Sequence, residues 1–334
     1  MILLARTGGG ALGSPTAILL FGSGRLGSAI RESLVRVGGW MSASIPFPWD
    51  DPRGLEEAAD RTILRALRLV GARGRVAVVW SAGACGFAAS EEDAAAEALS
   101  FGTMLAVALG IAERSGPLSV DLHLLSSAGG LFEGQVDVGP DSTPAPLRPY
   151  GRLKLAEERC VLDTAGTLRV RVYRVSSVYG PIRENRRMGL VSTLVRDCDE
   201  GRETPIFGGM DTLRDYVHAD DVGAFVARAV AAPASDPAPS VVFLASGKGT
   251  SIRDVVAAVS RATGKECRVR AKKGGDNDRP ITFSPSVRPP GWNPRDLERG
   301  IRDVHEDWVA ARKPAPKPVP KPKAKAKAKR SRKK

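Results

Sequence analysis

The sequence predicts an α/β protein built on a doubly wound parallel sheet. Apolar runs of strand length alternate with longer segments of helical period along the body of the chain. The first run, Ala17–Phe21, enters a glycine turn directly, and a helical period follows over residues 28–35. The chain has 334 residues, 43% of them apolar, and a chain of this length buries about three quarters of its unfolded surface. We therefore expect one large domain or two smaller ones.

The glycine turn consists of Gly22, Ser23, Gly24, Arg25, Leu26 and Gly27. Glycines let the backbone turn sharply and approach a pyrophosphate, whose charge the N-terminus of the next helix stabilises. The turn therefore predicts a Rossmann-type dinucleotide site. Gly8, Gly10 and Gly13 repeat the spacing but run into a Ser-Pro pair rather than a helix, so we assign residues 1–15 to a flexible N-terminal extension.

The next segments continue the alternation of helix and strand. Residues 54–70 and 92–114 have helical periods, and the apolar run Arg75–Trp80 between them has strand length. Three small residues follow this strand: Ser81, Ala82 and Gly83. Small side chains at the end of a strand allow a ligand to approach the backbone closely.

A further strand is predicted at Val120–Leu125, and Ser126 and Ser127 follow it. In an open parallel sheet, ligands bind at the carboxyl ends of the strands, so a hydroxyl there can reach a substrate oxygen. The alternative interpretation is a polar loop.

Tyr150 and Lys154 stand four residues apart just after Pro149 and share one face of a helix. A lysine cation beside a tyrosine favours the phenolate and lowers a pKa that is ordinarily about 10. The pair therefore predicts a general base that removes a proton from an alcohol.

The formal charge of +13 is concentrated in one segment. Residues 313–334 hold eleven Lys or Arg and no acid, so the remainder carries about +2. Because Lys alternates with Pro and Ala there, we expect residues 312–334 to be disordered. Such a tail can make nonspecific, salt-sensitive contacts to polyanions, although a solubilising role is the preferred interpretation.

The remaining composition excludes several classes of site. The four cysteines, at 85, 160, 198 and 267, are widely scattered, and the three histidines lack ligand spacing, so we predict no disulfide framework and no metal. No uncharged apolar run reaches the roughly 20 residues that cross a bilayer. Met1–Arg6 is too short for a signal-peptide core. We expect a cytoplasmic protein without a membrane span.

In this order, the motifs resemble those of the extended short-chain dehydrogenase/reductases, and among them the NAD-dependent nucleotide-sugar epimerase/dehydratase group. The resemblance covers residues 17 to about 310. It is carried by Gly22–Gly27, Ser126 with Ser127, Tyr150 with Lys154, Arg171–Pro181 and Leu213–Val222, and more weakly by Gly291–Pro294, Leu297 and Gly300.

The resemblance implies an organisation and a set of roles. It divides the chain into a cofactor domain, at 16–180 and about 214–245, and a smaller α/β substrate lobe, at 181–213 and about 246–311. It implies NAD on the glycine turn, on 81–83 and on the Tyr-Lys pair, and a homodimer formed through the 92–114 and Tyr150 helices. It also implies a nucleotide-sugar substrate held by Ser127, Ser177 and Arg214, although Arg214 can instead pair with a neighbouring aspartate.

Two departures from the family pattern leave alternatives open. The acid expected about 20 residues after the turn is replaced by Ser44 or Ile45. Asp50 or Asp51 can substitute for it, and Arg25 can favour a ribose phosphate, so NADP is not excluded. One alignment selects Ser127 as the catalytic serine, with Ser126 second, whereas another places Ala128 there.

Three function classes follow. The first is a nucleotide-sugar 4-epimerase of the UDP-glucose 4-epimerase type, in which Tyr150 works with Lys154 and a serine and the cofactor is regenerated in place. The second is an NAD(P)H-dependent reductase of a keto-sugar or other carbonyl compound. The third is a nonenzymatic dinucleotide-binding protein, against which the intact Tyr-Lys pair argues.

Overall fold

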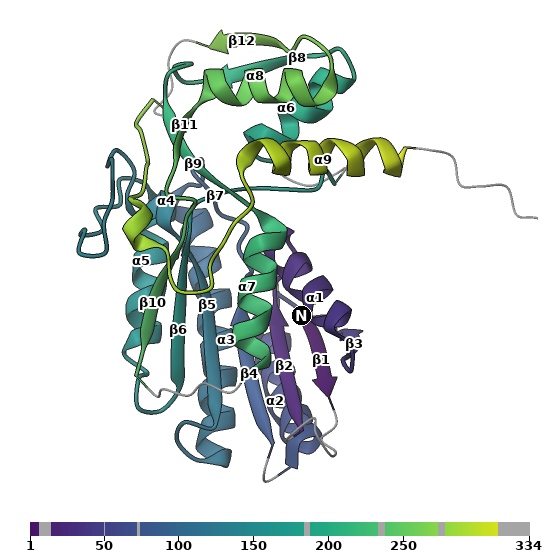
Figure 1. The fold of residues 1–334 in the computed structure, drawn as a ribbon. Helices are drawn as coiled ribbons and strands as arrows, with labels where there is room; N and C mark the ends of the chain where they lie inside the picture. The colour runs from purple at the N-terminus through teal and green to yellow at the C-terminus, as the bar shows by residue number, and fades with distance from the viewer. Residues whose placement is uncertain are drawn as a thin grey trace, which may run out of the picture.

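The computed structural model describes residues 1–6, 15–49, 51–71, 74–183, 188–232, 238–272 and 278–312. A seven-stranded sheet with the order β10-β6-β5-β4-β2-β1-β3 forms the central layer (Figure 1). Its strands are β1 (Ile2–Arg6), β2 (Thr16–Phe21), β3 (Met41–Ser44), β4 (Arg75–Trp80), β5 (Val120–Ser127), β6 (Arg169–Val175) and β10 (Ser240–Leu244). The adjacent pairs from β10 to β2 are all parallel, which confirms the predicted α/β fold.

The first strand corrects the prediction of a flexible extension over residues 1–15. Ile2–Arg6 forms β1, which lies antiparallel between β2 and β3 and pairs Leu3 with Leu19 on one side and Ala43 on the other. Leu4 is fully buried and its neighbours nearly so. A short apolar run is stable here because both of its edges are paired and both faces are covered. Residues 7–14, which include the second glycine set, lie outside the described residues.

Helices cover both faces of the sheet (Figure 1). On one face, α1 (Arg25–Val37) packs on α7 (Ala219–Ala231), where Gly223 lies against Ala29 so closely that a Cβ at 223 would be 2.6 Å from that of Ala29. On the other face, α2 (Pro52–Val70), α3 (Glu91–Ser115) and α5 (Pro149–Leu162) share one apolar core with the sheet. The predicted helices at 54–70 and 92–114 correspond to α2 and α3.

Helix α3 is long and apolar enough to cross a membrane by length and composition alone. Its N-terminus is capped reciprocally by Ser90 and Asp93. Its residues Phe101, Met104 and Ile111 are buried in the core against the sheet. In this structure α3 is therefore a core helix. The exposed Leu99 lies on the helix through which the resemblance implies dimerisation, and the homodimer stays a prediction.

A smaller group of elements lies beyond the carboxyl edge of the sheet (Figure 1). Helices α6 (Leu190–Asp199), α8 (Ile252–Thr263) and α9 (Leu297–Ala311) enclose an apolar cluster of their own with the parallel pair β8 (Glu203–Phe207) and β12 (Arg268–Lys272). The three-stranded sheet of β11 (Gly249–Ser251), β9 (Leu213–His218) and β7 (Ser177–Tyr179) connects this group to the large sheet. Short helical turns occur at α4 (Ala128–Leu131) and at Pro285–Val287. We keep the division into a cofactor domain and a substrate lobe as a proposal; the predicted tail at 313–334 lies outside the described residues.

Candidate active site

The glycine turn joins β2 to α1 and lies against the turn that follows β4. Gly22 has φ +107°, and a Cβ on it would lie 2.4 Å from the backbone nitrogen of Ala82. A Cβ on Gly27 would lie 2.0 Å from the carbonyl oxygen of Gly22. Glycine is therefore required at both positions by the backbone path itself.

A cavity of about 170 Å³ lies where the carboxyl ends of β4, β5 and β6 meet α5. The structure brings most of the predicted site residues to it: Leu26, Ser81, Ala82, Gly83, Ser126, Ser127, Tyr150 and Lys154 line it together with Cys85, Leu125, Val175, Ser176 and Val178. Residues from five separate parts of the sequence thus surround one space at the edge where a doubly wound sheet binds ligands.

The two serines differ in their surroundings. Ser127 caps the short turn of α4 by accepting a hydrogen bond from the Gly130 N–H at 3.0 Å, and its side chain also hydrogen-bonds Tyr150. The Ser126 hydroxyl is buried and has no hydrogen-bond partner among the described residues. Ala128, the alternative in the other alignment, is fully buried at the start of α4. The geometry therefore favours Ser127 as the partner of Tyr150.

Lys154 is held by two carboxylates. Its Nζ donates to Glu97 Oε1 at 2.7 Å and to Glu157 Oε2 at 2.9 Å, and it lies 5.8 Å from the centroid of the Tyr150 ring. All three charged side chains are at most 5% exposed. Burial alone acts to lower the pKa of Lys154, but Glu157, Tyr150 and Glu97 outweigh it and the pKa is raised. The ammonium therefore stays charged.

The pKa of Tyr150 departs from the prediction. Lys154 and the Ser127 hydrogen bond do act to lower it, as the spacing predicted. Burial is the larger effect, and Glu97 and Glu157 add to it, so the pKa of Tyr150 is raised above its ordinary value. The prediction of a lowered pKa was wrong because the sequence pattern contained the cation but neither the burial nor the two anions. Tyr150 is thus a neutral phenol at neutral pH.

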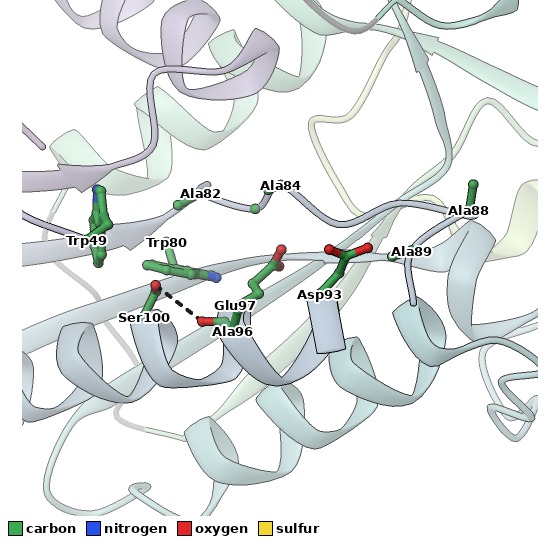
Figure 2. A pocket seen from close by; sticks show the side chains of 11 residues that line it. Trp49, Trp80, Ala82, Ala84, Ala88, Ala89, Asp93, Ala96, Glu97 and Ser100 are labelled. Carbon is green, nitrogen blue, oxygen red and sulfur yellow. Dashed lines mark hydrogen bonds between the residues drawn. The ribbon is translucent and has the colours of Figure 1, made fainter. Parts of the chain in front are cut away.

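A second cavity, of about 610 Å³, adjoins the first along Ala82 and Gly83. Figure 2 shows Asp93 and Glu97 extending from α3 toward the segment that carries Ala82 and Ala84, with the indoles of Trp49 and Trp80 at the other end. The Trp49 and Trp80 rings are 6.1 Å apart and edge to face. This cavity combines flat aromatic faces, small side chains and carboxylates.

A family model described as "NAD dependent epimerase/dehydratase family" matches residues 22–245, which is more than half of the chain and includes every residue of the smaller cavity. The chain belongs to this family. NAD is the cofactor that the family uses, and the predicted resemblance is confirmed.

The individual proteins that the chain resembles share at most about a third of its residues over the matched segment. The chain is 31% identical over 176 residues to the dTDP-L-rhamnose 4-epimerase of Burkholderia thailandensis, a match that covers 50% of this chain and 47% of that protein. The match thus spans about half the length of this curated relative. Among solved structures, UDP-glucose 4-epimerases of Thermotoga maritima, with UDP-glucose, and of Thermus thermophilus, with NAD, superpose with TM-scores of 0.69 and 0.62. Each is 23% identical, and each match covers 88% of this chain and 98% or 99% of the other. They show the same fold.

The described residues of this family member fit a dinucleotide. The N-cap of α1, Gly24, makes no side-chain hydrogen bond to the helix, and nothing lies within 4 Å of where its Cβ would be. The N–H groups of the first turn are therefore accessible to a phosphate, whose charge the helix dipole stabilises. The unpartnered Ser126 hydroxyl supplies a further polar group inside the smaller cavity.

The second strand differs from the usual doubly wound arrangement. β1 separates β3 from β2, so the end of β3 lies about 10 Å from β2 rather than about 5 Å. Ser44, at that end, is exposed and carries no charge. Of the substitutes considered, Asp51 caps α2 by accepting from the Arg53 N–H at 3.2 Å, and Asp50 lies outside the described residues.

Arg25 contacts the backbone of β7. Its Nη1 donates to the Val178 carbonyl of β7 at 2.9 Å. Burial and the charge of Arg183 lower its pKa. The guanidinium is therefore held by the backbone of β7, and its contribution to a preference for NADP stays a prediction.

Of the three predicted substrate residues, Ser127 lines the smaller cavity, whereas Ser177 and Arg214 do not. Ser177 begins β7 and is paired with Tyr216 of β9, and it is not among the described residues that line the cavity. The Arg214 guanidinium donates to the carbonyls of Leu213, at 3.1 Å, and Arg279. Its role in binding a diphosphate stays a prediction.

The sequence analysis missed Glu97 and Glu157. Glu157 is three residues after Lys154 and on the same face of α5, a spacing that marks a potential ion pair. Glu97 belongs to the buried stripe of α3 that includes Ala94, Phe101 and Met104. An acid at an apolar position of a helical stripe is the signal that could have identified it, because acids are rarely buried without a cation.

Proposed function

We propose that the protein is an NAD-dependent nucleotide-sugar 4-epimerase. The observation that carries the proposal is the cavity in which Tyr150, Ser127 and Lys154 meet beside the turns that lead to the glycine site. The family assignment supports an epimerase or dehydratase, and the relatives named above include 4-epimerases of dTDP-L-rhamnose and UDP-glucose. A nucleotide-activated hexose is the substrate class that these relatives favour.

Each residue has a distinct role in this proposal. Tyr150 acts as the phenolate: once the phenol has released its own proton to solvent, its phenolic oxygen takes the proton of the sugar hydroxyl and later returns it, while Ser127 orients that oxygen through its hydroxyl. Lys154 supplies the positive charge beside the ring that stabilises the phenolate. NAD, when bound, accepts the hydride from the sugar carbon and gives it back, so no net oxidation occurs. The chain contributes orientation, proton transfer and electrostatics.

The cavities also support NAD rather than NADP. The glycine turn would hold the pyrophosphate, and the larger cavity has room for a base and its ribose beside Trp49. Asp93 lines that cavity, and its carboxylate would accept from hydroxyl or amino groups but repel an additional phosphate.

The first test asks what the purified protein carries and whether it consumes cofactor. We expect denaturation to release about one NAD per chain, and a panel of UDP- and dTDP-sugars to show epimer formation without added cofactor. Tyr150→Phe should retain NAD and lose about 10²–10⁴-fold in turnover. An empty site, or turnover that consumes added cofactor in proportion to product, would rule out the internally recycling mechanism.

One observation favours a reductase as the second candidate. The raised pKa of Tyr150 keeps the phenol protonated, which suits a residue that first donates a proton to a carbonyl oxygen. A keto-sugar reductase would oxidise one NADH or NADPH for each product molecule. Product formed without this oxidation would exclude it.

A further inference from the structure

Glu97 connects three elements of the site from a buried position on α3. The residue is 6% exposed and follows the apolar stripe of the helix. Its Oε1 accepts from Lys154 Nζ at 2.7 Å, and its Oε2 accepts from the Cys85 N–H at 2.9 Å. One carboxylate thus binds the side chain of α5 and the backbone of the turn after β4.

The turn rests directly on this carboxylate. Gly83 has φ +155°, and a Cβ on it would lie 2.8 Å from Glu97 Oε1. Ala82 and Gly83 line both cavities, and Glu97 itself lines the larger one. A movement of Glu97 would therefore displace both the turn that lines the two cavities and the Lys154 ammonium beside Tyr150.

The charges around Lys154 do not cancel. Glu97 from α3 and Glu157 from α5 face the single ammonium, Asp93 lies one turn before Glu97, and the Cys85 thiol and Tyr150 hydroxyl are neutral groups beside them. Because an uncompensated buried charge is costly, the cluster favours uptake of a proton. In agreement, burial raises the pKa of Glu157 to about 7, with Lys154 opposing the rise and Glu97 adding to it.

We propose that Glu97 is a positioning residue that acts through Lys154: it fixes the ammonium to the turn at 81–85 and offsets its charge, so that Tyr150 keeps its proton until substrate and cofactor are bound. The inference rests on the proposed function only for the role of Tyr150. Nothing in the contacts of Glu97 requires it to touch a substrate.

Two substitutions separate the two parts of this role. Glu97→Gln keeps an amide oxygen for the Cys85 N–H and removes the negative charge, so the pKa of Tyr150 should fall by about one pH unit while NAD affinity stays within about twofold. Glu97→Ala also removes the anchor of the turn, so NAD affinity should fall by about tenfold or more. Glu113→Gln, at an exposed acid of the same helix, is the matched control.

The measurement is carbon-13 NMR of protein labelled at tyrosine Cζ, titrated with base. The chain has four tyrosines, and Tyr150→Phe assigns the Tyr150 resonance by its disappearance. Calorimetric titration of the cofactor-free protein with NAD gives the affinities. Neither readout needs turnover. Failure to epimerise any sugar would therefore count against the proposed function, whereas the role of Glu97 would still be decided by the tyrosine titration and the NAD affinities.

The inference is supported if the Tyr150 midpoint falls in Glu97→Gln and not in Glu113→Gln. It is overturned if Glu97→Gln folds with an unchanged midpoint, or if Glu97→Ala binds NAD as the wild type does. Should Glu97→Gln not fold, Glu157→Gln removes the other carboxylate without touching the turn. A lower Tyr150 midpoint with unchanged NAD affinity would then support the charge part of the role, and an unchanged midpoint would overturn it.

Discussion

The glycine turn and the Lys154 cluster bound the same site but are stabilised in opposite ways. At Gly22 the backbone path is set by shape, because a φ of +107° and the nearby Ala82 nitrogen admit no side chain. At Lys154 the arrangement is set by charge, because one ammonium is shared by two buried carboxylates from different helices. We therefore expect the first region to be sensitive to side-chain volume and the second to be sensitive to protonation.

This difference predicts the largest effect for loss of the lysine charge. Lys154→Met leaves Glu97 and Glu157 facing each other without a cation, and breaking a buried pair in this way costs about 3–5 kcal/mol. The cost should be greater at pH 8 than at pH 6, because the carboxylates can take up protons at the lower pH. Urea unfolding at both pH values measures it.

The matched control for this variant lies on the same helix. Arg152 pairs with Glu91 at 2.5 Å, but both side chains are at least half exposed, so Arg152→Met should cost about 0–1 kcal/mol. Equal losses for the two variants would show that the Lys154 cluster contributes no more than a surface ion pair.

The second effect tests the shape-dependent region. Gly22→Ala forces an alanine into a positive φ and a Cβ to within 2.4 Å of the Ala82 nitrogen, so we expect a loss of about 1–3 kcal/mol. NAD affinity should fall with it, since the two turns would separate. Thermal unfolding and calorimetric NAD titration give the two values.

Gly24 supplies the comparison within the same turn. Its φ is −67° and nothing lies within 4 Å of its Cβ position, so Gly24→Ala should fold as the wild type does and lose affinity only for the cofactor. If Gly22→Ala behaved like Gly24→Ala, the turn would not be set by shape.

The contrast also explains what the sequence could and could not predict. The strand at Arg75–Trp80 coincides with β4, and the glycine turn, the serine strand and the Tyr-Lys helix all form where predicted, because each is encoded by neighbouring residues. The position of β1 depends on its pairing with two strands that follow later in the chain. Glu97 and Lys154, which form an ion pair, are 57 residues apart in sequence. Local patterns carry no signal for such contacts beyond an acid in an apolar stripe.

The third effect concerns the pH dependence of stability. The pKa of Glu157 is raised from 4.5 to about 7, chiefly by burial, so the folded protein binds this proton more tightly than the unfolded chain does. The contribution of Glu157 to stability is therefore full below about pH 4.5 and is lost as the pH rises through about 7. Glu157→Gln cannot ionise, so the stability of the wild type relative to this variant should decline across that window. Urea unfolding at several pH values measures the decline, with Glu306→Gln, an exposed position on α9, as the flat reference. Parallel curves for wild type and Glu157→Gln would mean that Glu157 is ionised throughout and that Lys154 satisfies both carboxylates.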